Sequence, residues 1–114
     1  MITGSAPISS EVLNTLKVVF SCPIREGYGQ TETSAPATLT GLYDSESGHV
    51  GGPIACVKMR LKDIPEMEYH STDNPPRGEI CFKGPSIFRG YYKDPVKTKE
   101  AFDSDGWLRS GDVG

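Results

Sequence analysis

The first hydrophobic pattern along the chain has a helical period. A set of apolar residues recurs at the spacing that gathers side chains on one face of a helix: Val12, Leu13, Leu16, Val19 and Phe20. Ser9 precedes this set as an N-cap, and the Cys22-Pro23 pair ends it. The pattern predicts a helix whose apolar stripe packs on a sheet as core.

Further along, apolar and polar residues alternate with the period of a strand. Three apolar residues (Val57, Met59, Leu61) alternate with three cations (Lys58, Arg60, Lys62), which predicts a half-buried strand with a solvated cationic face. Strands are also expected at residues 1–3, from Ile24, at 38–40, at 79–83 and at 107–110, the last ending at Gly111-Asp112. A short helix begins with Asp94 as N-cap and Pro95 at the first position, and reaches about Phe102.

These elements divide the chain into two parts. Residues 1–50 are predicted to form an α/β portion, in the order strand, turn, helix, strand, turn, and residues 51–114 a β-rich portion. Ligands bind open α/β layers beyond the carboxyl ends of the strands. Two glycine-containing turns, at residues 4–7 and 27–33, fall at that edge. Strand-like residues at both ends of the chain suggest a piece of a longer protein.

Composition and charge narrow the function classes. With 114 residues, 36% apolar and 24% charged, the chain has the composition of one globular domain or a part of one. The net charge of −3 disfavours a nucleic-acid-binding surface. The sequence has no apolar run of the roughly 18 residues that a membrane helix needs, and no signal-peptide pattern. A soluble protein facing the cytosol is expected.

The cysteines and histidines of the chain do not have the spacing of metal ligands. Cys22, Cys56 and Cys81 are odd in number and widely spaced, so reduced thiols are expected in place of zinc ligands or disulfides. His49 and His70 are isolated, and we interpret them as structural or exposed.

The segment Gly27-Tyr28-Gly29-Gln30-Thr31-Glu32-Thr33 combines three chemical groups suited to a nucleotide. Its two glycines let the backbone bend and approach a ligand, with the Tyr28 ring between them free to stack on a base. The Thr31 hydroxyl can bond a phosphate oxygen, and the Glu32 carboxylate is a hard ligand suited to Mg²⁺. The alternative is a polar glycine-rich turn with a capping threonine, since short motifs also match by chance.

Five motifs in order resemble those of the adenylate-forming superfamily, which includes acyl-CoA synthetases, luciferases and peptide-synthetase adenylation domains. They are Gly4-Ser5-Ala6-Pro7, the segment 27–33, Gly78-Glu79-Ile80-Cys81, Gly90-Tyr91-Tyr92-Lys93-Asp94-Pro95 and Asp105-Gly106-Trp107-Leu108-Arg109-Ser110-Gly111-Asp112. The segment 27–33 and residues 62–67 are most similar to eukaryotic long-chain fatty acyl-CoA synthetases. The resemblance covers essentially the whole chain. It implies a fragment of the large N-terminal domain, an α/β layer followed by a β-rich, distorted barrel-like part.

The resemblance also implies roles for particular residues. Gly4, Ser5 and Ala6 would lie along the adenine edge of ATP or AMP, and Tyr28, between Gly27 and Gly29, would stack on the adenine. Thr31 would face the phosphate and Glu32 would hold Mg²⁺. Asp112 would accept hydrogen bonds from the ribose hydroxyls, and Trp107 is expected to pack in the core.

The implied reaction is ATP-dependent, AMP-forming ligation of a long-chain fatty acid to coenzyme A through an acyl adenylate. The phosphate loop and the catalytic lysine of the superfamily have no match in this chain, so we expect it to be inactive alone. The expected location is the cytoplasm or the cytosolic face of intracellular membranes, with any membrane attachment outside this segment. Two alternatives stay open: an adenylating enzyme for aryl or amino acids, and a non-catalytic β-rich binding module.

Overall fold

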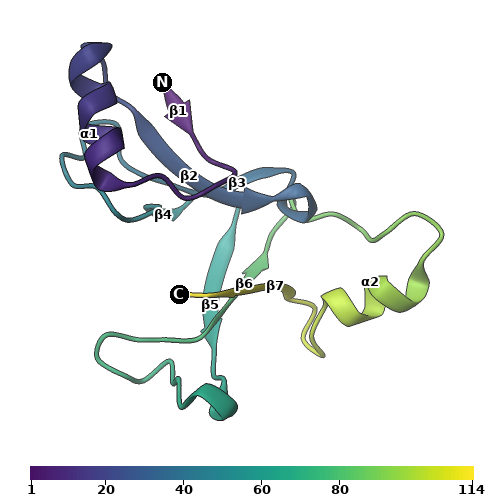
Figure 1. Ribbon diagram of the computed structural model, residues 1–114. Helices are drawn as coiled ribbons and strands as arrows, with labels where there is room; N and C mark the ends of the chain where they lie inside the picture. The colour runs from purple at the N-terminus through teal and green to yellow at the C-terminus, as the bar shows by residue number, and fades with distance from the viewer. The chain divides into compact units, whose positions relative to one another are not determined.

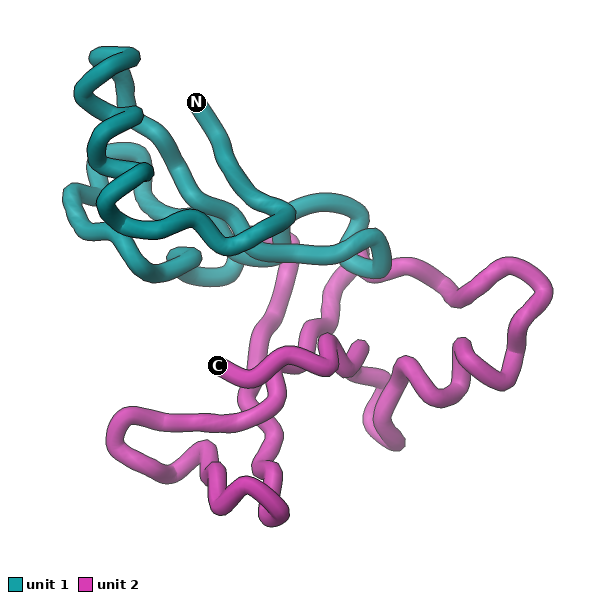
Figure 2. The backbone as a smooth tube through the Cα atoms, viewed as in Figure 1, with its two compact units in different colours: residues 1–54 teal, residues 55–114 magenta.

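Two separate sheets organise the computed structural model, which describes residues 1–114 (Figure 1). One sheet has the strand order β1-β2-β3-β4 and the other the order β5-β6-β7. Each sheet belongs to its own unit, residues 1–54 and residues 55–114 (Figure 2). The division therefore falls after Ile54, whereas the sequence placed it after residue 50.

The first unit is the predicted α/β layer. Its elements are β1 (Ile2–Thr3), α1 (Ser10–Val19), β2 (Arg25–Gln30), the 3-10 helix η1 (Thr31–Thr33), β3 (Ala35–Leu39) and β4 (Gly52–Pro53). β1 pairs with β2 in parallel, so α1 is the crossover between them, and the β2–β3 and β3–β4 pairs are antiparallel. The parallel pair puts the segment that follows β1 beside β2, at the edge where a ligand was expected.

Helix α1 begins as predicted, but its apolar stripe is only partly buried. The Ser9 hydroxyl oxygen accepts the N–H of Val12 at 3.3 Å, as an N-cap does. Leu13 is 2% exposed, whereas Val12, Val19 and Phe20 are 49%, 66% and 52% exposed. The prediction that the whole stripe is core is wrong. Leu13 is the only buried residue of α1 and Leu16 is partly buried, so the helix contacts the rest of its unit along one narrow line.

The second unit is an antiparallel sheet with one short helix. Its elements are β5 (Lys58–Lys62), the 3-10 helix η2 (Pro65–Met67), β6 (Glu79–Lys83), α2 (Pro95–Ala101) and β7 (Leu108–Val113). The predicted cap of α2 is present, because an Asp94 carboxylate oxygen accepts the N–H of Lys97 at 2.9 Å. Cys81, Phe82 and Leu108 are at most 1% exposed and form the core. Neither α1 nor α2 has the length and apolar character of a membrane-crossing helix.

Arg60 departs from the predicted solvated face of β5. Its guanidinium pairs with the Asp103 carboxylate and lies over the Trp107 ring, 4.5 Å from the ring centroid. Partial burial of Asp103 opposes ionisation, but N–H bonds from Trp107 and Asp105, together with Arg60, outweigh it and hold the pKa of the Asp103 carboxyl below its ordinary value. Lys58 and Lys62 are exposed, as predicted. Arg60 is thus a structural residue of the β5–β7 sheet.

Candidate functional site

The two glycines of the 27–33 segment lie in a strand and not in a turn. Gly27 pairs with Leu39, and Tyr28 with Thr38, so this part of β2 forms a hairpin with β3. The predicted sharp bend is wrong because pairing with β3 keeps the segment extended. A register irregularity between Tyr28 and Gly29 is all that interrupts the pairing, and the chain turns later, at Thr31–Thr33.

Close backbone packing explains the glycines of this region. A Cβ atom on Gly29 would clash with the carbonyl oxygen of Ala35 and lie 2.9 Å from the nitrogen of Ala37. A Cβ atom on Gly4 would lie 2.7 Å from the carbonyl oxygen of Gly27. Both glycines let one backbone segment lie directly against another, and this fixes the floor of the site.

We expect Gly29→Ala to destabilise the chain by about 2 kcal/mol, because the new methyl group meets backbone atoms that cannot move aside. Gly52→Ala is the matched control, since Gly52 also pairs with β3 but has open space where its Cβ would be. It should change stability by less than about 0.5 kcal/mol. Urea unfolding of the 114-residue chain measures both. Equal effects would show that packing at Gly29 is not the constraint.

Thr33 holds the turn that carries the candidate phosphate and metal residues. It is 1% exposed, and its hydroxyl oxygen accepts the N–H of Gln30 at 3.0 Å. The hydroxyl proton has two carbonyl acceptors in reach, on Gln30 at 2.8 Å and on Ala35 at 2.7 Å. Two residues with positive φ follow, Ser34 at 58° and Ala35 at 126°. The sequence offered a turn with a capping threonine as the alternative for this segment but did not say which threonine, and the structure places the cap at Thr33, three residues after Gln30.

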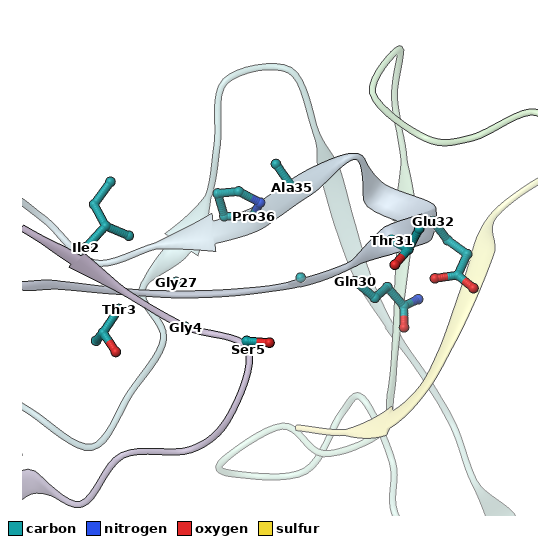
Figure 3. Close-up of a pocket in the computed structure, with 11 residues that line it drawn as sticks. Ile2, Thr3, Gly4, Ser5, Gly27, Gln30, Thr31, Glu32, Ala35 and Pro36 are labelled. Atoms are coloured by element: carbon teal, nitrogen blue, oxygen red, sulfur yellow. The ribbon is translucent and has the colours of Figure 1, made fainter.

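A cavity of about 570 Å³ lies against this hairpin (Figure 3). It is lined by Ile2, Thr3, Gly4, Ser5, Gly27, Gly29, Gln30, Thr31, Glu32, Ala35 and Pro36. Figure 3 shows Gln30, Thr31 and Glu32 together at the turn end of the hairpin, and Gly4 and Ser5 on the segment that follows β1. The glycine floor of the cavity is formed by Gly4, Gly27 and Gly29, and its polar end by residues 30–32.

The structure brings together most of the first unit's predicted site residues. Gly4, Ser5, Gly27, Gly29, Thr31 and Glu32 all line the cavity. Ala6 and Tyr28 are outside its lining, and Tyr28 is half-buried in the β2–β3 ladder. Asp112 belongs to the second unit.

The donor set of the cavity suits a phosphorylated ligand with a divalent cation. The Thr31 hydroxyl can donate to a phosphate oxygen, and the Glu32 carboxylate is a hard oxygen ligand. No group of three or more His, Cys, Asp or Glu side chains in the chain could hold a metal ion. A cation at Glu32 would need ligand oxygens as further partners, which is how Mg²⁺ is commonly held beside phosphates.

Asp112 lies in a bulge of β7. The β6–β7 ladder pairs Cys81 with Arg109 and Glu79 with Val113, so three residues of β7 oppose one residue of β6 between these pairs. Gly111, at the centre of the bulge, has a φ of 77°. The Ser110 hydroxyl oxygen accepts the N–H of Asp112 at 3.0 Å. The strand was predicted to end at Gly111-Asp112, but it continues to Val113, and the bulge sets Asp112 apart from the ladder.

The class of protein to which the chain belongs follows from its match to a known family. Residues 1–92 match the family described as AMP-binding enzyme. The chain belongs to the AMP-binding enzyme family, as the motif resemblance predicted.

Two relatives with more specific names are similar to this chain over nearly all of its length. The chain is 50% identical to the peroxisomal Long chain acyl-CoA synthetase 7 of Arabidopsis thaliana over 98% of its own length. It is 49% identical to Long-chain-fatty-acid--CoA ligase 1 of Homo sapiens over its whole length. It spans 16% of the length of each of these relatives.

A solved structure confirms the fold class. The A domain of carboxylic acid reductase from Segniliparus rugosus, in complex with AMP and a co-purified carboxylic acid, is 37% identical with a TM-score of 0.77. The match covers 98% of this chain and 16% of that one. The expectation of an α/β layer followed by a β-rich part of an adenylate-forming enzyme is confirmed.

Proposed function

We propose that this chain is the nucleotide-binding portion of an ATP-dependent, AMP-forming ligase that joins a long-chain fatty acid to coenzyme A. The observation that carries the proposal is the 49% identity, over the whole chain, to a protein named as a long-chain-fatty-acid–CoA ligase. The cavity at β1 and β2 supports it, since six residues to which the resemblance assigns contacts with ATP line it: Gly4, Ser5, Gly27, Gly29, Thr31 and Glu32.

The first unit would hold the adenine and the phosphates. Gly4 and Ser5, which follow β1, and Ala6 beyond them would border the adenine, and the Tyr28 ring would stack on it. The Thr31 hydroxyl would donate to a phosphate oxygen. Because Thr33 is buried and hydrogen-bonded to the backbone on both sides of the turn, Thr31 would be held in one orientation.

Glu32 would supply the protein ligand to Mg²⁺, and its carboxylate on the rigid turn fits that role. When bound, Mg²⁺ neutralises charge that develops on the phosphates. Asp112 would accept hydrogen bonds from the 2′- and 3′-hydroxyls of the ribose. Its position in a bulge separates its side chain from the regular β6–β7 pairing.

The proposed reaction has two steps. A carboxylate oxygen of the fatty acid attacks the α-phosphorus of ATP, the bond to pyrophosphate breaks, and an acyl adenylate forms. The thiolate of coenzyme A then attacks the acyl carbon and displaces AMP. Thr31 and Glu32 would act in the first step, where phosphate charge is redistributed. We also propose a cytosolic location or attachment to the cytosolic face of an intracellular membrane.

A chimera tests the proposed function. Residues 1–114 replace the matching segment of the human ligase 1, giving what we call the ligase chimera. We expect palmitoyl-CoA formation within about tenfold of the unmodified human enzyme, since the polar end and glycine floor of the cavity are supplied intact. The readouts are palmitoyl-CoA and AMP, with circular dichroism to verify folding.

The control chimera carries the matching segment of the reductase A domain in the same place. That segment should support less palmitoyl-CoA formation, because it comes from a carboxylic acid reductase and not from a long-chain-fatty-acid–CoA ligase. A ligase chimera that folds but forms no palmitoyl-CoA would contradict the proposal. An adenylate released without thioester formation would favour the alternative of an adenylating enzyme of another type.

A further inference from the structure

We propose that Glu79 is a positioning residue that fixes the backbone of the Asp112 bulge and so determines recognition of the ribose. The inference rests on the proposed function, because it assigns Glu79 a task only through Asp112. It concerns the second unit alone. The resemblance implied only that Gly78 and the strand after it, with residues 90–94, are scaffold that positions Asp112, and it gave no role to the Glu79 side chain.

The bulge leaves backbone groups without ladder partners. Regular pairing holds on one side at Cys81 and Arg109, and on the other at Gly78 and Gly114, whose N–H and carbonyl groups exchange two bonds of 3.0 Å. Between these points, residues 110–112 lie opposite Ile80 alone and outside the regular register. Side chains provide acceptors for two of their N–H groups, and one of these is the Ser110 hydroxyl, which accepts the N–H of Asp112.

The Glu79 carboxylate is one of these acceptors. Its oxygen Oε1 accepts the N–H of Gly111 at 3.3 Å. The Nε of Arg109 lies 3.2 Å from Oε1 and 3.1 Å from Oε2. The Glu79 side chain is 10% exposed and that of Arg109 is 47% exposed, so a largely buried carboxylate is neutralised by a cation at the surface. The Glu79 side chain therefore contacts both Arg109 and Gly111, the first and last residues of the segment that precedes Asp112.

Packing does not provide this restraint. No atom lies within 4 Å of the position that a Cβ on Gly111 would occupy. Glu79, Arg109, Ser110 and Gly111 border a cavity of about 410 Å³, so this side of the bulge is open. A glycine with a φ of 77° and open space on its Cβ side is not held in that conformation by side-chain packing. The hydrogen bond from its N–H to Glu79 is a contact that does restrain it.

The test uses the ligase chimera and the ratio of kcat/KM for ATP to that for 2′-deoxy-ATP. Glu79→Ala is expected to raise the KM for ATP about fivefold, to leave kcat within about twofold, and to lower the ratio towards that of Asp112→Ala. Glu79→Gln keeps an acceptor for Gly111 but loses the charge that pairs with Arg109. It should lower the ratio by only about threefold. The Glu79→Ala, Asp112→Ala double variant should show no further loss, because both changes act on one contact.

Asp103→Asn is the matched control, since Asp103 is another arginine-paired carboxylate of the same unit and does not contact the bulge. It should lower thermal stability and leave the ratio unchanged. If Asp112→Ala lowers the ratio but both Glu79 variants keep it, the inference is wrong. If Asp112→Ala itself keeps the ratio, the ribose assignment fails and the inference with it. Where Glu79→Ala does not fold, the wild-type ratio in Glu79→Gln is sufficient to overturn the inference.

Discussion

Asp112→Ala in the ligase chimera is expected to raise the KM for ATP by roughly 10- to 150-fold, with a much smaller change in kcat. A carboxylate that accepts bonds from two vicinal hydroxyls holds the ribose before and after adenylate formation. Its loss therefore weakens the ground state and the transition state together. The range corresponds to about 1.5–3 kcal/mol for a charged hydrogen bond. Initial rates over a range of ATP concentrations measure it.

The same variant should lose its preference for ATP over 2′-deoxy-ATP, because the partner of the 2′-hydroxyl is gone. Asp105→Ala is the matched control, as its side chain is 69% exposed and lies before β7 in the same unit. It should retain the preference. If Asp112→Ala lowers stability and leaves the preference at the wild-type ratio, Asp112 serves only the structure of the bulge.

Glu32→Gln should lower the rate of adenylation about a hundredfold, or about 2.7 kcal/mol of activation free energy. The amide keeps the shape of the side chain and removes the charge that would bind Mg²⁺. The turn that carries it should keep its conformation, because the buried Thr33 hydroxyl bonds the backbone on both sides of the turn. Pyrophosphate release from ATP and palmitate measures the step.

Raising the Mg²⁺ concentration should partly restore the rate of Glu32→Gln, since weaker binding can be offset by mass action. Glu11→Gln is the control, because Glu11 is an exposed carboxylate in the first turn of α1. A Glu32→Gln enzyme with the wild-type rate and an unchanged Mg²⁺ dependence would contradict the metal role.

Local signals in the sequence predicted the elements well. The cap at Ser9, the Asp94-Pro95 start of α2 and the alternation in β5 all act within a few residues, and each element is present. Features that depend on distant residues were predicted poorly. Arg60 was expected in solvent because its partner, Asp103, lies 43 residues further along the chain.

The same distinction applies to the 27–33 segment. Its glycines suggested a turn, but β3 pairs with them and needs their missing side chains for close backbone contact. Local sequence cannot distinguish a glycine that bends a chain from one that admits a neighbouring strand.

Tyr28, Thr31 and Glu32 followed from the chemistry of their side chains and the other candidate site residues from the motif resemblance, and most of those in the first unit line one cavity. A capping threonine was also foreseen in the turn, but only the structure shows that it is Thr33. The contact of the Glu79 carboxylate with Gly111 depends on an offset in the register of two strands, so it could not be predicted from residue type.

The bulge in β7 adds residues to the strand that regular pairing with β6 does not require. Between its two anchoring pairs β7 has two residues more than an unbroken ladder would require. Deleting two residues there should let the strands pair continuously, and the buried residues Phe82 and Leu108 lie outside the deleted stretch. We therefore expect the surplus length to be dispensable for the sheet and to serve the proposed role of Asp112. In this sheet the position of a side chain depends on the number of residues in the strand as well as on the types of residue.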